Sequence, residues 1–460
     1  MKIVLISNPV THKQKPNFPP PGIAYLGAIA HKAGHNISLI DGGLRSLSQI
    51  TKSISQSAPD LIGLTCWTID RGMVWKLCDS IKQAAPDAFL VLGGPHATIF
   101  PEHIFKKTHA SAVVIGEGEK TFHELITALE TGSDLKNVKG LVLRAEDGKP
   151  FYTPQRQLVE DINSIPLPYY EGFENFNFAN YAGFPALPSP TAAVISSRGC
   201  VYDCTYCSST RFWGRNWRFR SAQSVLDEIA WLIEKHKIKS VYFFDDNFPV
   251  NKERAVSICE GIIKNHWNIK WACCSHVKMM NPQLLKAMKA SGCVAIDFGV
   301  ESGSDKILKN INKCQTRADI EKTFAMVHES GILPRAYLMV GSPGEDISTI
   351  DETIDLIGRI KPHSSVGASI LWLLPGTDVY ESAVKNDFID EKYWLDHDNI
   401  PFNLQEHSLA ELRSLTKRLM IGIAMKKPGI LPKFQFLLKR LYYKYPALSV
   451  FRSMVPKKLR

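Results

Sequence analysis

The chain has no long hydrophobic run. No stretch reaches the roughly 18 consecutive apolar residues that a membrane-spanning helix needs. Its first residues, MKIVLISNPV, hold an apolar run too short for a secretory signal, and no small-residue cleavage site follows. With ten cysteines and no export signal, we expect reduced thiols and a cytoplasmic location. Clustered cysteines in such a chain more often bind metal than pair.

Acidic residues are missing from the end of the sequence. Ten Lys or Arg residues lie between Lys426 and Arg460, a stretch that contains no Asp or Glu. The rest of the chain holds 45 basic and 45 acidic residues, so the net charge of +10 belongs entirely to this end. A charge-neutral body argues against a nucleic-acid groove, and we expect no nucleic-acid partner.

The 460 residues suffice for two or three domains, and 45% hydrophobic with 22% charged residues indicates a folded chain. Short apolar runs alternate with amphipathic stretches at residues 2–7, 36–41, 60–65, 88–94 and 111–118. This alternation predicts an α/β fold with a doubly wound parallel sheet, a Rossmann-like domain over residues 1–140. Ligands bind at the carboxyl ends of the strands in such sheets.

The same rhythm resumes after residue 190. Six further apolar runs, from AAVISS to GASILWLLPG, predict a partial (β/α)6 barrel over residues 191–385, with its chemistry at the strand carboxyl ends. Residues 141–190 are rich in Pro, Phe and Tyr, and we interpret them as a strap packed between the domains. We expect residues 386–460 to form a C-terminal helical region with a basic amphipathic tail.

A fourth cysteine is missing from the motif RGCVYDCTYCSS. Cys200, Cys204 and Cys207 form a C-x3-C-x2-C run directly after the first barrel strand. A structural zinc site uses four ligands, whereas an iron–sulfur cubane with three protein thiolates leaves one iron open to a small molecule. The alternative is a zinc knuckle with a distant fourth ligand. The position on the barrel rim favours the cluster.

This motif on a partial barrel resembles the radical S-adenosylmethionine (SAM) enzymes over about residues 190–380. The resemblance implies a [4Fe–4S] cluster on the three cysteines and SAM on the open iron. FFDDNF departs from the commoner Gly-Gly-Glu form, and its acids are also suited to capping the next helix. The implied SAM contacts are Tyr206, Asp245, Asp246, Glu301, Ser302, Tyr337 and Gly341.

The first domain resembles the cobalamin-binding domain joined to many radical SAM enzymes, through PPPGIAYLGAIAHKAGH, LGGPHATIFPE and VVIGEGEKTFHEL. The string Asp-x-His-x-x-Gly is missing, so we expect no cobalt ligand from His12 or His96. Apolar side chains such as Trp67 would shield the lower corrin face. The implied cobalamin contacts are Asn8, Pro9, Gly22, Thr65, Cys66, Trp67, Thr68, Gly93, Gly94, Gly116, Glu117, Gly118 and Glu119.

The C-terminal stretch LPKFQFLLKRLYYKYP places apolar and aromatic residues on one helical face and basic residues opposite. Such a helix is typical of an interfacial anchor, which would hold the protein at the inner face of the membrane. The alternative is a helix docked on the barrel with a solvated basic face.

Together the two resemblances imply a class B radical SAM C-methyltransferase. Such an enzyme splits SAM to a 5′-deoxyadenosyl radical and transfers methyl from methylcobalamin to an unactivated carbon. The expected partners are a small-molecule or lipid substrate and an electron donor such as flavodoxin or ferredoxin. Two alternatives stay open: a radical SAM cyclase or oxidase with the same cofactors, and a non-catalytic cobalamin- or lipid-binding protein with a structural cluster.

Overall fold

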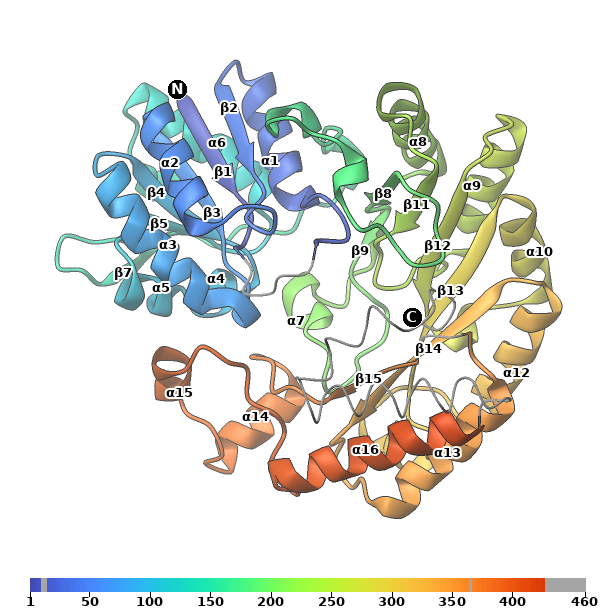
Figure 1. Ribbon diagram of the computed structural model, residues 1–460. Helices are drawn as coiled ribbons and strands as arrows, with labels where there is room; N and C mark the ends of the chain where they lie inside the picture. Colours follow the sequence, from blue (N-terminus) through green and yellow to red (C-terminus); the bar gives the residue numbers. More distant parts are fainter. Residues whose placement is uncertain (10–14, 364–365, 427–460) are drawn as a thin grey trace, which may run out of the picture. The chain divides into compact units, whose positions relative to one another are not determined.

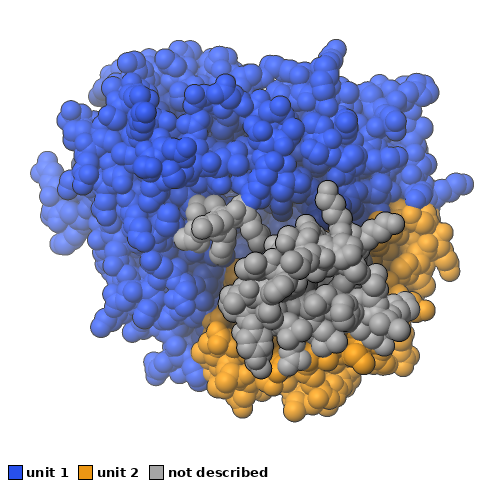
Figure 2. All heavy atoms as spheres, in the orientation of Figure 1, with its two compact units in different colours: residues 1–275, 283–295, 373–401 blue, residues 276–282, 296–372, 402–460 orange. Residues whose placement is uncertain are grey.

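The computed structural model describes residues 1–9, 15–363 and 366–426 of the chain (Figure 1). Its contacts divide it into two compact units, which Figure 2 colours separately. Unit 1 holds residues 1–275, 283–295 and 373–401, and unit 2 holds residues 276–282, 296–372 and the chain from 402 on. The chain therefore crosses between the units several times.

Unit 1 begins with a seven-stranded sheet in the order β2-β1-β3-β4-β5-β6-β7 (Figure 1). The first five strands pair in parallel, with Ile3 opposite Ile37 and Leu61. This arrangement confirms the predicted doubly wound parallel sheet. The strands are β1 (Lys2–Ile6), β2 (Asn36–Ile40), β3 (Leu61–Thr65), β4 (Phe89–Gly93) and β5 (Ala112–Val114).

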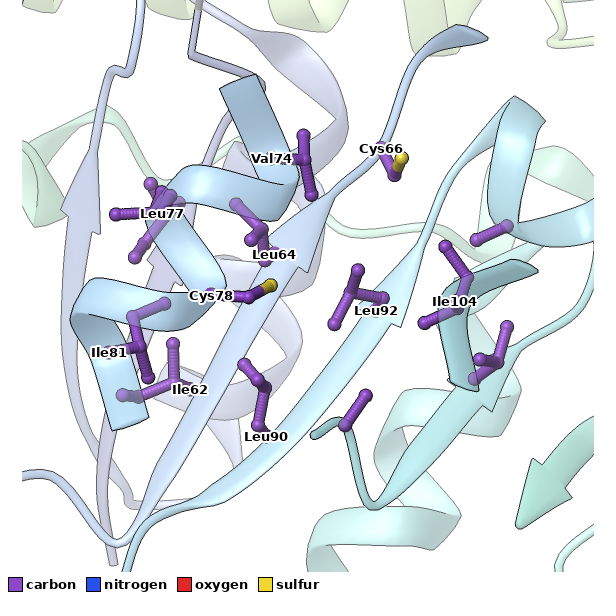
Figure 3. Close-up of a cluster of buried hydrophobic side chains, with 14 of the residues drawn as sticks. Ile62, Leu64, Cys66, Val74, Leu77, Cys78, Ile81, Leu90, Leu92 and Ile104 are labelled. Atoms are coloured by element: carbon purple, nitrogen blue, oxygen red, sulfur yellow. The ribbon is translucent and has the colours of Figure 1, made fainter. Parts of the chain in front are cut away.

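Helices follow these strands and bury them. One core cluster joins β3 and β4 to the helix after β3 through side chains such as Leu64, Leu77 and Leu92 (Figure 3). Each fully buried aliphatic side chain stabilises the fold by about 1.5–3 kcal/mol, which is why the strands are nearly continuous apolar runs. The helices are α1 (Pro21–Lys32), α2 (Leu47–Ser57), α3 (Arg71–Ala84), α4 (Pro95–Ile99), α5 (Pro101–Lys107) and α6 (Gly118–Thr131).

Two strands that the sequence pattern did not reveal extend this sheet. β6 (Leu141–Arg144) and β7 (Pro150–Tyr152) pair antiparallel beyond β5. They fall at the start of the stretch that we interpreted as a strap. Strands of three and four residues at a sheet edge hold too few residues for a clear period of two, so tertiary pairing decides them.

The second sheet has six strands in the order β15-β14-β13-β12-β11-β8, which confirms the predicted partial barrel. β8 pairs in parallel with β11, and β11 with β12. The strands are β8 (Thr191–Val194), β11 (Ser240–Phe243), β12 (Lys270–Ser275), β13 (Cys293–Glu301), β14 (Leu333–Val340) and β15 (Val366–Ile370). A separate ribbon pairs β9 (Ser197–Arg198) antiparallel with β10 (Arg218–Phe219).

Helices separate the barrel strands and follow them. Their starts are fixed locally; the Asn251 side chain, for example, accepts from the Arg254 amide at 2.8 Å. The helices are α7 (Ser209–Trp213), α8 (Ala222–His236), α9 (Lys252–Lys264), α10 (Pro282–Ala290), α11 (Asp305–Asn310), α12 (Arg317–Glu329), α13 (Ile347–Ile360), α14 (Asp378–Lys385), α15 (Glu391–Asp396) and α16 (Leu409–Lys426).

In the part of the chain that the structure describes, no helix combines the length and apolarity needed to cross a bilayer. The basic helix predicted in LPKFQFLLKRLYYKYP lies outside the described residues, and of the basic stretch 426–460 the structure describes Lys426 at the end of α16. His12 also lies outside them.

Candidate cofactor sites

The three motif cysteines lie on one loop between β9 and α7. Cys200, Cys204 and Cys207 are all half-buried, none is in a disulfide, and the Cys207 amide donates to the Cys204 carbonyl at 3.1 Å. Gly199 opens the loop at φ 87°, where a Cβ atom would lie 2.9 Å from the Asn216 carbonyl oxygen. Three thiols on one half-buried loop match the donor set of an iron–sulfur cluster. Among the described residues, no three His, Cys, Asp or Glu side chains converge as they would on a single metal ion.

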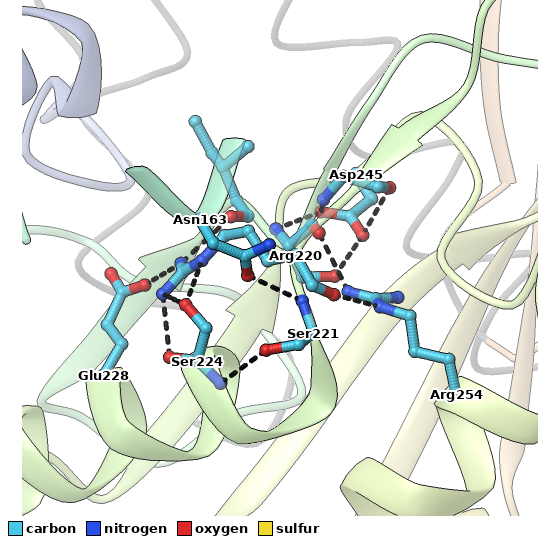
Figure 4. Close-up of polar contacts among 10 residues, drawn as sticks. Asn163, Arg220, Ser221, Ser224, Glu228, Asp245 and Arg254 are labelled. Atoms are coloured by element: carbon cyan, nitrogen blue, oxygen red, sulfur yellow. Dashed lines mark hydrogen bonds and ion pairs between the residues drawn. The ribbon is translucent and has the colours of Figure 1, made fainter. Parts of the chain in front are cut away.

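The carboxylate of Asp245, which we predicted to bind the SAM amino group, already accepts hydrogen bonds from within the protein. Asp245 is 3% exposed, and its carboxylate accepts from the amide and hydroxyl of Ser196, at 2.7 and 2.5 Å, and of Ser197, at 3.1 and 2.8 Å (Figure 4). Burial raises the pKa of Asp245, and these bonds oppose the rise. Asp245 therefore fastens the end of β11 to the base of the segment that carries the three cysteines (the cluster loop, residues 199–214), and its contact with SAM stays a prediction.

Asp246, the next residue, is exposed and accepts a hydrogen bond from the Ser209 hydroxyl at 2.5 Å. Ser209 is the first residue of α7, so this carboxylate stays beside the cluster loop. Of the two acids in FFDDNF, Asp246 is the exposed one, and its contact with SAM stays a prediction. Tyr206 is half-buried in the same loop, between the second and third cysteines.

Glu301 and Ser302 lie at the carboxyl end of β13. Glu301 is held at φ 63°, a conformation that costs a non-glycine residue about 1 kcal/mol or more, and its carboxylate lies 2.9 Å from Lys313 Nζ. Strain of this kind is typical of functional positions. Ser302 is 1% exposed, and its hydroxyl bonds Thr353 and the Ser304 amide. The Ser302 hydroxyl therefore closes the turn, and its contact with SAM stays a prediction.

Tyr337 and Gly341 belong to β14 and the loop after it. The Tyr337 hydroxyl lies 3.3 Å from Asp297 Oδ2 and accepts from Arg335 at 3.3 Å, while 39% of the residue is exposed. Gly341 has φ 93°, and the Asn403 side chain donates to its carbonyl at 2.9 Å. A backbone fixed in this way, without a Cβ atom, suits close approach by a flat ring such as adenine.

In the fold around the first sheet, Asn8 organises the loop after β3. Its Oδ1 accepts from the Trp67 amide at 3.0 Å, and its Nδ2 donates to Asp70 at 2.9 Å. Trp67 is 51% exposed, although indole is largely apolar. Gly94 has φ 97°, and a Cβ atom there would lie 3.0 Å from the Thr65 methyl group. An exposed indole next to a tightly packed glycine turn fits a flat ligand such as a corrin.

The remaining predicted cobalamin residues divide into two groups. Pro9 and Thr68 are buried, and Thr65 and Gly93 are half-buried at the ends of β3 and β4. A Cβ atom on Gly22 or Gly116 would meet nothing within 4 Å, so their surroundings are open, whereas one on Gly118 would contact Leu26 at 3.4 Å. All of them come from loops at the carboxyl edge of the first sheet or from the helices that follow.

Cys66 and His96 both point into the protein core. Cys66 is 0% exposed within the cluster of Figure 3, and burial raises the pKa of its thiol; its contact with cobalamin stays a prediction. His96 is 0% exposed among Trp75, Phe100 and His103, and burial lowers its pKa.

Glu117 and Glu119 are held by arginines. Arg198 contacts Glu117 at 2.6 Å and Glu119 at 2.5 Å, and Arg218 contacts Glu117 at 2.8 Å. Burial would raise the pKa of Glu117, but hydrogen bonds from Arg218 and the charge of Arg198 outweigh it and lower the pKa. Both acids are engaged by arginines, and their contact with cobalamin stays a prediction. The sequence signal for this network is Arg198 directly before the cysteine motif, in SSRGC, a residue to which we had assigned no role.

Models of two protein families match the chain: the radical SAM superfamily at residues 194–357 and the B12 binding domain at residues 8–126. An uncharacterised methyltransferase of Pyrococcus horikoshii is 31% identical over 442 residues, covering 94% of each chain. An anaerobic magnesium-protoporphyrin IX monomethyl ester cyclase of Rubrivivax gelatinosus is 27% identical, covering 73% of this chain and 61% of the cyclase.

Among solved structures, the radical SAM methyltransferase TsrM of Kitasatospora setae, with tryptophan and a SAM analogue bound, superposes with a TM-score of 0.70. It is 19% identical, and the match covers 84% of this chain and 77% of TsrM. The fold and the cysteine loop thus define a radical SAM enzyme with a B12 domain. The chain belongs to the cobalamin-dependent radical SAM methyltransferase family, whose cofactors are a [4Fe–4S] cluster, SAM and cobalamin.

Proposed function

We propose that this enzyme transfers a methyl group from cobalamin to an unactivated carbon of an apolar substrate. The proposal rests on one observation: the cluster loop and the cobalamin-binding fold belong to one compact unit and share buried ion pairs. Methyl transfer needs both cofactors at one active site. The methyltransferase relative, which matches almost the full chain, supports the same reaction.

When bound, the reduced cluster supplies the electron that splits SAM, and cobalamin supplies the methyl group. The protein has to hold and orient these groups. Cys200, Cys204 and Cys207 would carry the cluster. Asp246 and Glu301 are carboxylates suited to the ammonium and hydroxyl groups of SAM, and the backbone at Gly341 is suited to its adenine. Trp67, fixed through its amide by Asn8, would lie against the lower corrin face and keep water from the cobalt.

An aromatic wall in unit 1 supports an apolar substrate. Phe18 stacks on Tyr242 with ring centroids 5.6 Å apart and meets Phe244 edge-on at 6.1 Å, and Phe184 lies 4.4 Å from Tyr242. Phe244 is 53% exposed. Exposed aromatic surface of this kind favours the binding of a flat or apolar molecule. A polycyclic or isoprenoid lipid would match it, as would another hydrophobic natural product.

A second reaction is favoured by a specific observation. The relative from Rubrivivax gelatinosus is named as a cyclase and matches 73% of this chain. A cyclase with the same cofactors would split SAM without transferring its methyl group.

The two reactions differ in their co-products. Reconstituted full-length enzyme is incubated with reduced flavodoxin, trideuteromethyl-SAM and, in turn, a porphyrin, a polycyclic triterpene and an indole. Methyl transfer gives S-adenosylhomocysteine, 5′-deoxyadenosine and a product bearing the labelled methyl group. A cyclase gives 5′-deoxyadenosine alone, which would contradict the proposal. The Cys200→Ala, Cys204→Ala, Cys207→Ala triple variant is the control and forms neither nucleoside.

Two further features belong to this proposal. Reduction of the cluster calls for an electron donor such as flavodoxin or ferredoxin. The basic end of the sequence, outside the described residues, would bring the enzyme to the inner face of the membrane, where a lipid substrate is concentrated.

A further inference from the structure

Four charged side chains meet at the base of the cluster loop. Glu117 directly precedes α6, Glu119 lies in its first turn, Arg198 ends β9, and Arg218 starts β10. In the register of the ribbon, Arg198 and Arg218 face each other. The acids come from the cobalamin-binding fold, and the arginines come from the ribbon that frames the cysteine loop. All four residues belong to unit 1.

The contacts are short and shielded from water. The side chains of Arg198 and Glu117 are 7% and 3% exposed, and that of Glu119 is 12% exposed. Glu117 also accepts from the Val159 amide at 2.5 Å, and Arg218 donates to the Val159 carbonyl at 2.6 Å. Two positive and two negative charges therefore neutralise one another inside the protein. Glu117 has a fixed direction, because its donors come from different elements, and Glu119 is held by Arg198.

Arg198 also contacts the far end of the same loop. Its guanidinium lies 5.3 Å from the ring centroid of Trp213, the last residue of α7. The three cysteines lie between these two residues in the sequence. One guanidinium thus holds the beginning and the end of the cluster loop and, through Glu117 and Glu119, the first turn of α6.

A buried ion pair adds little net stability, because desolvation offsets most of the attraction, but it accepts only one geometry. Apolar surfaces can slide against each other, whereas two carboxylates that bind one planar guanidinium are held in a single arrangement. Reactions between two bound groups are sensitive to displacements of about 1 Å. An enzyme that passes a methyl group between SAM, cobalt and substrate therefore needs a fixed distance between its two cofactor-binding parts.

We propose that Arg198, through Glu117 and Glu119, is a positioning residue that sets the cluster loop in register with the cobalamin-binding fold. The inference applies to any substrate and does not depend on the substrate class proposed above. It presupposes only that the enzyme binds the three cofactors of its family, the cluster, SAM and cobalamin.

The first test uses the protein without cofactors. Hydrogen exchange followed by mass spectrometry is measured for peptides covering residues 199–214. Glu119→Gln should raise their exchange about tenfold, because loss of one charged hydrogen bond loosens the loop locally. Arg198→Lys keeps the positive charge but loses the planar guanidinium that binds both carboxylates, and it should raise the exchange of these peptides to the same extent. The matched control is Glu124→Gln on the same helix, whose carboxylate pairs with Arg156, and it should leave these peptides unchanged.

The second test uses the loaded enzyme and two rates. Methylation of reduced cobalamin by SAM requires both parts in register, whereas 5′-deoxyadenosine formation requires only the cluster and SAM. Glu119→Gln should slow the first about tenfold and change the second less than about twofold. Cobalamin affinity, followed by its visible spectrum, should stay within about threefold, because the Glu119 carboxylate is engaged by Arg198.

Three results would overturn the proposal. Unchanged exchange in residues 199–214 would show that the pair does not hold the loop. Equal loss of both rates would indicate general destabilisation. A loss of cobalamin affinity matching the loss of rate would return Glu119 to the role of a cofactor contact. If Glu119→Gln fails to fold, Arg198→Lys decides by the same measurements.

Discussion

Glu345 lies 2% exposed in the loop that follows β14, where it accepts from the Gly341 amide at 2.5 Å. Burial raises the pKa of Glu345 from its ordinary 4.5 to about 7, against the bonds from Gly341 and Ser342. The folded chain therefore holds this proton up to neutral pH, while the unfolded chain loses it near pH 4.5. The contribution of this raised pKa to the free energy of unfolding is fully present below pH 4.5 and is lost as the pH rises towards 7.

The size of this effect follows from linkage: a raised pKa of this extent corresponds to about 3 kcal/mol. We expect Glu345→Gln to flatten the fall in unfolding free energy between pH 5 and 7, measured by urea denaturation at several pH values. Glu406→Gln is the matched control, since its exposed carboxylate accepts from the neighbouring Gly344 amide at 2.6 Å. Parallel pH profiles for wild type and Glu345→Gln would contradict the assignment.

At the scale of elements, Arg71 joins α3 to the segment around α15. It is 0% exposed, and its guanidinium donates to the carbonyls of Trp394 at 3.2 Å, Asp398 at 3.1 Å and Asn399 at 3.0 Å. It also lies 4.9 Å from the Trp394 ring. The same stretch of chain reaches the cluster loop, where the Val379 amide donates to the Thr205 carbonyl at 3.2 Å.

We expect Arg71→Lys to loosen this segment, because an ammonium group cannot serve as many carbonyls as a planar guanidinium. The predicted loss is about 2–4 kcal/mol of unfolding free energy, from buried acceptors left without donors. Limited proteolysis should cut first within residues 390–400. Arg45→Lys, at the exposed pair with Glu174, is the control and should change little. Wild-type resistance in Arg71→Lys would show that apolar packing holds the segment.

At the scale of the whole molecule, the charge distribution predicts where the enzyme works. We expect the full chain to sediment with vesicles containing anionic lipid, and a chain ending at Met425 to stay in solution. Apolar contact should supply most of the attraction and the basic residues its preference for anionic lipid, so added salt should weaken binding only partly. Binding to neutral vesicles gives the comparison. Equal sedimentation of the two chains would show that the basic residues after Met425 do not anchor the protein.

The order of elements could be predicted from the sequence. Period and length of the apolar runs depend on local physics, so five parallel strands, the six-stranded barrel and the cysteine loop were all foreseen. A C-x3-C-x2-C run carries its chemistry in its spacing, and it needs no partner distant in the sequence.

The direction of each side chain could not be predicted. Asp245 and Glu117 are acids in the expected loops, yet Ser196, Ser197, Arg198 and Arg218 bind them. Cys66 follows a strand as expected, yet packs inward. These outcomes depend on donors that are distant in the sequence and meet only in the folded chain. The sequence by itself determined the fold and the cofactors, whereas tertiary structure decided which carboxylates stay open to them, because a buried charge takes the nearest donor.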